Sequence, residues 1–235
     1  MNPLCVYSKG ICLLKKEETW VSLIALLAAG VSPNIFPIAQ AGLAKMSDLA
    51  IWFQIPSLFL LAAVFIYSMF RKLNRLSRHI WVGIIVGMIA TIGLEVVRYS
   101  SFRLGGMPGN LPRLMGVLIT DSFMQGPSLR SDILGYLYHY WNGACFGLIY
   151  SILFGHKSWY WGVAYGITIG FGFLVSSAVK VLGIGFMGLE MPTMPLTVIV
   201  AHVVYGCELG WLSQKWLWDT RTILHKEILL TYCHE

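Results

Sequence analysis

The most prominent pattern in the chain is a series of long apolar runs separated by polar stretches. A run of about 18 or more mostly apolar residues can cross a bilayer as an α-helix. About six such runs are present, at 20–44, 48–70, 80–98, 132–154, 158–182 and 195–217. They predict an all-α, polytopic transmembrane helix bundle. We expect one membrane domain at 20–217, between an N-terminal segment at 1–19 and a tail at 218–235.

Composition favours the same placement. Hydrophobic residues make up 57% of the 235 residues and charged residues 12%, and the mean hydropathy is +0.68. With only 11 acidic residues, the chain lacks the polar surface that covers a soluble core. A soluble enzyme, a disordered chain and a coiled coil are therefore excluded.

The basic residues predict the orientation. Their densest stretch, 71–78, lies between the second and third apolar runs. The positive-inside bias places this loop in the cytoplasm. With six spans, both termini are then cytoplasmic, as expected for a multi-pass protein of the inner (plasma) membrane. The basic residues behind the net charge of +6 orient the protein in the bilayer and contact anionic lipid. Nucleic acid is therefore not an expected partner.

The first apolar run contains Pro33 and Pro37, each of which removes a backbone donor. One interpretation is a kinked or broken span, in which freed carbonyls and Asn34 point at other helices or a cavity. The other is a signal peptide, with an apolar core at 20–32 and a small-x-small cleavage site at 39–41. Both interpretations remain open from the sequence.

Two apolar runs in the C-terminal half share the motif His-x-x-x-Gly-x-x-x-Gly, beginning at His139 and at His202. The run between them carries three glycines at the same spacing. Residues four apart share a helix face, and glycines on that face let a neighbouring backbone approach closely. We expect these three spans to form a tight bundle, with the third span (Gly83 and Gly87) as its fourth member. The expected packing residues are Gly143, Gly147, Gly162, Gly166, Gly170, Gly206 and Gly210.

The two histidines lie at matching depth. Each follows the start of its span by seven residues, and the two spans run in the same direction, so both lie about 10 Å below the outer boundary. Further polar residues gather at this level, where burying them is costly unless they face a bundle or a cavity. The predicted ligand-binding site comprises His139, His202, Asn142, Glu95, Arg98, Glu190, Lys180 and Tyr205.

Structural interpretations of the same residues remain open. Glu95 and Arg98 are three residues apart and could form a simple ion pair. Each histidine could make an interhelical hydrogen bond, and Lys180 could extend to the outer surface.

A divalent metal is one possible cofactor. His139 and His202, joined by Glu95 or Glu190, form a reasonable donor set for zinc or iron. Haem is disfavoured, because glycines on the histidine face draw the helices together whereas a porphyrin holds them apart.

The longest outer loop, 99–131, is rich in turn formers. We expect 115–120 to dip into the interface and cover the level of the histidines, as a lid does. Arg103, Arg113 and Arg130 suit an anionic substrate or a lipid headgroup, and ion pairs within the loop explain them equally well.

Ala201-His202 followed by small residues resembles the last catalytic helix of rhomboid proteases, and His139 with Asn142 is similar to their oxyanion helix. The glycines here come one residue later, the asparagine spacing differs, and no Gly-x-Ser-Gly nucleophile is present. We therefore do not assign the chain to that family.

The sequence thus predicts a protein that binds or transports a small molecule or ion in an outward-facing polar pocket. The alternative is an intramembrane enzyme, a hydrolase or transferase that depends on a metal or histidine, and a third possibility is a structural subunit. An oligomer is compatible with each. Transport requires a polar path to the inner side, for which the sequence offers only Glu208, Ser151 and Ser213.

Overall fold

The computed structural model describes residues 3–217, with side chains from residue 17 onward, so the predicted tail at 218–235 lies outside the described residues. The described part is all-α, which confirms the predicted fold class. Its α-helices are α1 (Pro3–Gln40), α2 (Met46–Leu49), α3 (Ile55–Phe70), α4 (Asn74–Arg103), α5 (Leu111–Ile119), α6 (Leu129–Phe154), α7 (Tyr160–Val175), α8 (Ser177–Lys180) and α9 (Thr193–Trp216). A π-helical turn, η1 (Ala50–Gln54), joins α2 to α3, and a 3-10 turn, η2 (Phe186–Gly188), precedes α9.

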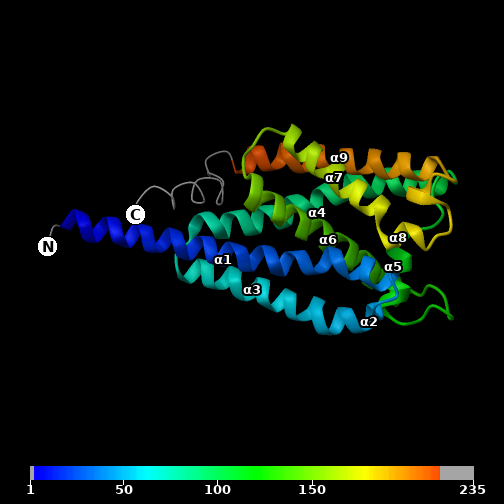
Figure 1. Ribbon diagram of the computed structural model, residues 1–235, viewed down its shortest axis with the longest axis horizontal. Helices are drawn as coiled ribbons and strands as arrows, with labels where there is room; N and C mark the ends of the chain where they lie inside the picture. The colour runs from blue at the N-terminus through cyan, green and yellow to red at the C-terminus, as the bar shows by residue number, and fades with distance from the viewer. Residues whose placement is uncertain (1–2, 218–235) are drawn as a thin grey trace.

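The long helices lie roughly along one axis in three layers (Figure 1). Helices α7 and α9 form one outer layer, α4 and α6 the middle layer, and α1 with α3 the other outer layer. The short helices α5 and α8 lie at one end of the bundle, together with the loops at 104–110 and 120–128 on either side of α5. We call this the loop end, and we call the opposite end, with the turn at 71–73, the basic end.

Four segments are long and apolar enough to cross a membrane, namely Glu17–Gln40, Met46–Phe70, Asn74–Arg103 and Thr193–Trp216. This is compatible with a membrane protein, but the predicted count of about six spans is not confirmed. Helix α6 is long but carries polar residues, including Asp132, His139 and Asn142. Helix α7 ends at Val175, where Ser176 turns to an extended conformation, rather than continuing to the predicted end at 182.

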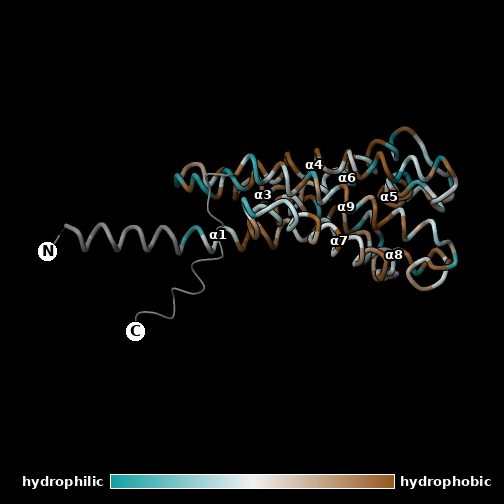
Figure 2. Tube along the Cα trace, turned by 90° about the horizontal axis from the view of Figure 1, so that it is seen from above, coloured by the Kyte–Doolittle hydropathy of each residue, from teal (hydrophilic) through white to brown (hydrophobic). Residues whose placement is uncertain are grey.

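Hydropathy varies along the long axis of the bundle. In Figure 2 the hydrophobic colour predominates in the middle of the bundle and the hydrophilic colour gathers toward its two ends. The outer face of the second segment exposes large apolar side chains; Trp52 is 73% exposed and Phe70 is 82% exposed. A surface of this kind suits lipid rather than water.

Helix α1 continues through Pro33 and Pro37, so the first span is not broken there. The hydroxyl of Tyr138, on α6, lies between two backbone groups of this helix. It donates to the Ser32 carbonyl oxygen at 2.7 Å and accepts from the Phe36 amide at 3.3 Å. The side chain thus bridges a donor and an acceptor four residues apart in the proline-containing segment of α1.

Glycines make close helix contacts, but they do not join the fourth, fifth and sixth apolar runs into the single tight bundle that was expected. A Cβ atom on Gly87 of α4 would overlap the carbonyl oxygen of Gly143 on α6, and one on Gly162 of α7 would overlap that of Gly206 on α9. The glycines therefore join the helices as two pairs, α4 with α6 and α7 with α9. A hydrogen bond of 2.8 Å from the Tyr205 hydroxyl to the Gly143 carbonyl oxygen links the two pairs.

Acidic residues of α1 hold the basic end. The Glu18 carboxylate accepts the backbone N–H of Leu76, in the first turn of α4, and forms an ion pair of 2.6 Å with Arg75. It therefore caps the N-terminus of α4, where backbone donors have no partner within the helix. Glu17 pairs with Arg71 at 2.8 Å and, by this hydrogen bond, raises the pKa of the Arg71 guanidinium.

We expect Gly87→Ala to destabilise the folded protein by about 1–3 kcal/mol, because the added methyl group forces α4 away from α6. The matched control is Gly30→Ala on α1, where a Cβ atom meets nothing within 4 Å. Alanine is favoured over glycine inside helices, so the control should be neutral or slightly stabilising. Thermal unfolding of the purified protein in detergent measures both effects, and equal losses would contradict the close contact.

Candidate ligand-binding site

A cavity of about 680 Å³ lies in the loop-end half of the bundle. Residues of α1, α4, α5, α6, α7, α8 and α9 line it, together with the segment at 107–110. Most of its wall is apolar and includes Phe36, Leu94, Leu114, Met115, Phe146, Ile169 and Phe173. A concave, mostly apolar cavity with a few converging polar groups is the usual form of a small-molecule site.

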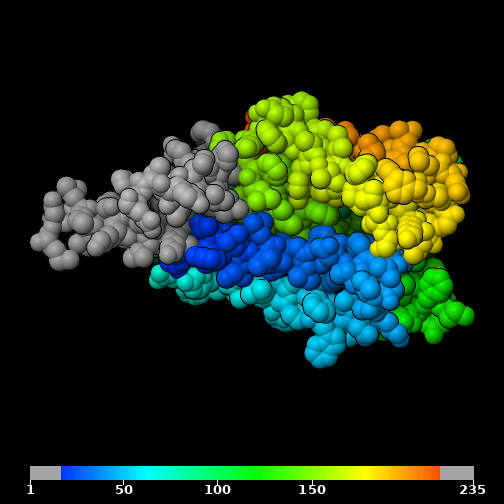
Figure 3. Space-filling view, viewed as in Figure 1, coloured from blue at the N-terminus to red at the C-terminus, as the bar shows by residue number. Residues whose placement is uncertain are grey.

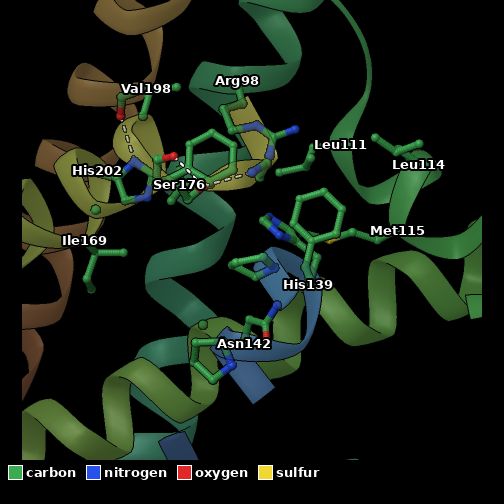
Figure 4. A pocket seen from close by; sticks show the side chains of 18 of the residues that line it. Arg98, Leu111, Leu114, Met115, His139, Asn142, Ile169, Ser176, Val198 and His202 are labelled. Atoms are coloured by element: carbon green, nitrogen blue, oxygen red, sulfur yellow. Dashed lines mark hydrogen bonds between the residues drawn. The ribbon is translucent and has the colours of Figure 1, made fainter. Parts of the chain in front are cut away.

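The polar groups of this cavity are largely those singled out from the sequence. Five of the eight predicted site residues line it, namely Arg98, His139, Asn142, His202 and Tyr205. Figure 4 shows His202 of α9, Arg98 of α4 and His139 of α6 around the same space. The structure therefore brings together side chains from three helices that are far apart in the sequence.

Glu95 does not line the cavity but lies directly behind His139. Its carboxylate oxygen Oε2 is 3.1 Å from Nε2 of His139 and 4.0 Å from an Nη atom of Arg98. All three side chains are buried, with 8%, 9% and 6% of the residue exposed for Glu95, His139 and Arg98. The predicted ion pair with Arg98 is thus present but long, and the carboxylate lies closer to the imidazole.

His202 is oriented by its own helix. Its Nδ1 atom lies 2.7 Å from the Val198 carbonyl oxygen, one turn earlier in α9. Because a carbonyl only accepts, Nδ1 carries the proton, and Nε2 of the neutral ring is then an acceptor. The ring packs against Gly170, where a Cβ atom would lie 2.9 Å from Cγ of His202. The predicted interhelical hydrogen bond of this histidine is therefore replaced by one within the helix.

Helix α1 closes one side of the cavity and is held there by α6. The Ser32 hydroxyl donates to Oδ1 of Asn142 at 2.5 Å, one turn beyond the contact made by Tyr138. Asn34 lines the cavity, as one interpretation of the first span predicted, while its amide donates to the Gly30 carbonyl oxygen at 2.7 Å. Two side chains of α6 thus position the proline-containing segment of α1.

Helix α5 covers the loop end of the cavity. Leu111, Leu114 and Met115 line the cavity from this helix, and Gly116 fits against the α6 backbone at Ser131. The sequence placed a covering segment at 115–120 but did not predict a helix beginning at Leu111. The available signal was the apolar spacing i, i+3, i+4 after Asn110, whose side chain caps the helix.

Basic residues near this helix point to loop partners rather than to the cavity. Arg113 forms an ion pair of 2.9 Å with Asp132, and Lys45 forms one of 3.0 Å with Asp121. These hydrogen bonds raise the pKa of the Arg113 guanidinium and of the Lys45 ammonium group. Pairing within the loop region therefore accounts for Arg113, while Arg103 and Arg130 are exposed.

Besides Glu95, two predicted site residues lie outside the cavity. Lys180 is exposed in the last turn of α8, and Glu190 is exposed beyond η2, with its Cγ atom against Gly185. Both follow the end of α7 at Val175, where the chain turns at Ser176 into the short helix α8. The pattern of apolar residues continues past this point and does not reveal the turn at Ser176.

A metal site with the predicted ligands is not assembled. Across the side chains described, 17–217, no group of three or more His, Cys, Asp or Glu residues converges to hold an ion. Glu190 lies outside the cavity, and Nδ1 of His202 is occupied by the Val198 carbonyl oxygen. Only His139 and Glu95 of the predicted donor set are in contact.

Comparison of the chain with protein-family models, with curated proteins and with solved structures finds no match.

We expect Tyr138→Phe to destabilise the fold by about 1–3 kcal/mol, because the Ser32 carbonyl and the Phe36 amide lose a buried partner. Backbone amide exchange in α1 near Phe36 should become faster. The control is Tyr140→Phe, since the structure gives the Tyr140 hydroxyl no hydrogen bond within 17–217. Hydrogen–deuterium exchange with mass spectrometry measures this, and unchanged exchange near Phe36 would contradict the bridging role.

Proposed function

We propose that this protein is a multi-pass membrane protein that binds an amphiphilic small molecule in the cavity. The cavity itself carries the proposal: about 680 Å³ with largely apolar walls, in which Arg98, His139, Asn142 and His202 gather. Apolar walls bind a hydrocarbon body and the polar groups orient a head, which is how small-molecule sites divide these tasks.

Access from the side of the bundle supports a ligand that arrives through the membrane. Asn34 on α1 and Gly172 on α7 both line the cavity and are both exposed on the molecular surface. Figure 3 shows the face on which α1, in blue, borders the yellow-green part of the chain that contains α7. A ligand dissolved in the bilayer can therefore reach the cavity between these two helices.

Binding is favoured over transport by the packing of the basic-end half. There Val82, Val86, Tyr150 and Leu209 belong to one buried apolar cluster. The Ser151 hydroxyl, one of the few polar groups available for a path, donates to the His79 carbonyl oxygen. An apolar cluster and an engaged hydroxyl thus stand among the described residues where a polar route would have to run.

The predicted orientation completes the proposal. The basic end would lie in the cytoplasm of a cell with the protein in its inner membrane, and the cavity would lie in the outer half of the bilayer. Helix α5 and the loops on either side of it would then cover the cavity from the outer side.

We expect Gly172→Phe to weaken amphiphile binding by roughly tenfold or more, because the ring occupies open space at the cavity wall. Gly30→Phe is the matched control, since it adds the same ring in open space at a helix position outside the cavity. The measurement is native mass spectrometry of delipidated protein with hexadecanol, hexadecanoate and hexadecyl phosphate. The proposal fails if none of the three binds with one-to-one stoichiometry, or if both variants bind as the wild type does.

A further inference from the structure

We propose that the head of the bound amphiphile is an oxyanion, a carboxylate or a phosphate monoester, and that Arg98 binds it. This ligand class rests on the proposed function, because it presupposes that the cavity holds an amphiphile. Its basis is a buried guanidinium at the cavity wall, whose Nε atom has no hydrogen-bond partner among the described residues.

Arg98 is the one residue with a fixed charge among those that line the cavity. Arg98 is only 6% exposed, and its buried Nε atom has no hydrogen-bond partner among the described residues. A guanidinium presents five N–H donors in a planar fork and has no neutral form to adopt. Burying such a group without acceptors is costly, and more so within a bilayer. An acceptor in the cavity removes that cost.

Glu95 does not meet this need. Its carboxylate is 4.0 Å from the Arg98 guanidinium, beyond hydrogen-bonding distance, and lies nearer to His139 at 3.1 Å. The pair is therefore close enough to reduce the buried charge but does not form the bidentate arrangement that satisfies a guanidinium. The fork remains open to a second oxyanion.

Two other polar groups of the cavity are already bonded within the protein. Asn142 accepts the Ser32 hydroxyl, and the Tyr205 hydroxyl donates to the Gly143 carbonyl oxygen. Among the residues that line the cavity, Arg98 is the one with a fixed positive charge for a ligand. Carboxylate and phosphate oxygens match the guanidinium fork, whereas a neutral hydroxyl can occupy only one donor.

The apolar wall identifies the remainder of the ligand. Phe146, Ile169 and Phe173 extend the cavity surface along α6 and α7, and Gly172 lies at the exposed side of the same wall. A hydrocarbon chain can thus lie against these residues while its head contacts Arg98. The ligand class is therefore an anionic amphiphile and not a free inorganic anion.

The test compares three ligands of equal chain length on the purified full-length protein. We expect hexadecanoate and hexadecyl phosphate to bind roughly tenfold or more tightly than hexadecanol. Arg98→Gln should remove this preference while hexadecanol binding is retained. Lys180→Gln, which removes an exposed cation at the same end of the molecule, should preserve the preference. Inorganic phosphate, which has no chain, should not displace hexadecanoate at the same concentration.

The outcomes separate the ligand class from the proposed function. If hexadecanol binds wild-type protein as tightly as the anions and Gly172→Phe abolishes all binding, the cavity binds amphiphiles but the oxyanion assignment is overturned. If no amphiphile binds, both proposals fail. Displacement of hexadecanoate by inorganic phosphate at equal concentration would overturn the requirement for a chain.

Two further variants keep the test decisive if Arg98→Gln does not fold. The double substitution Glu95→Gln with Arg98→Gln leaves no uncompensated buried charge and should also bind the three ligands equally. Arg98→Lys keeps the charge without the fork, so preference for the anions should fall several-fold but persist. Preference as strong in the double variant as in the wild type would overturn the role of Arg98.

Discussion

The close approach of helix backbones at glycines is the constraint on which the rest of this structure depends. Gly87 against Gly143 draws α4 onto α6, and Gly162 against Gly206 draws α7 onto α9. In a bilayer, where apolar side chains gain little by leaving lipid, such backbone contact is a principal source of helix association. Because the glycines act within pairs, α6 and α7 are not drawn together as closely, and the cavity lies between the two pairs and α1.

The wall formed by α1 depends on a second, more local interaction. Pro33 and Pro37 weaken the helix at the level of the cavity, and Tyr138 and Asn142 of α6 supply the hydrogen bonds that keep this segment in place. The same two prolines line the cavity. Side chains of a neighbouring helix thus help to hold this wall of the cavity in place, in addition to the backbone bonds of α1 itself.

The charges of the site are arranged with a carboxylate behind and a guanidinium in front. Glu95 contacts His139 and lies near Arg98, while only the latter two line the cavity. Burial of a single arginine would be unfavourable, and the nearby carboxylate reduces that cost without occupying the donors. The guanidinium donors of Arg98 thus remain directed to the cavity, inside a bundle whose walls there are mostly apolar.

Apolar runs were sufficient to predict an all-α bundle, and the glycine spacing indicated which helix faces allow close approach. Five of the residues singled out for a binding site line the cavity. Periodicity reports which face of a helix a residue occupies and how deep it lies, and these are local properties of the chain. It does not report which neighbour that face meets, so the pairing of α4 with α6, the intrahelical bond of His202 and the location of Lys180 and Glu190 outside the cavity all required the fold. The contact of the Tyr138 hydroxyl with the α1 backbone likewise joins groups more than 100 residues apart in the sequence. Contacts of this kind are decided by three-dimensional packing, because no local pattern encodes the partner.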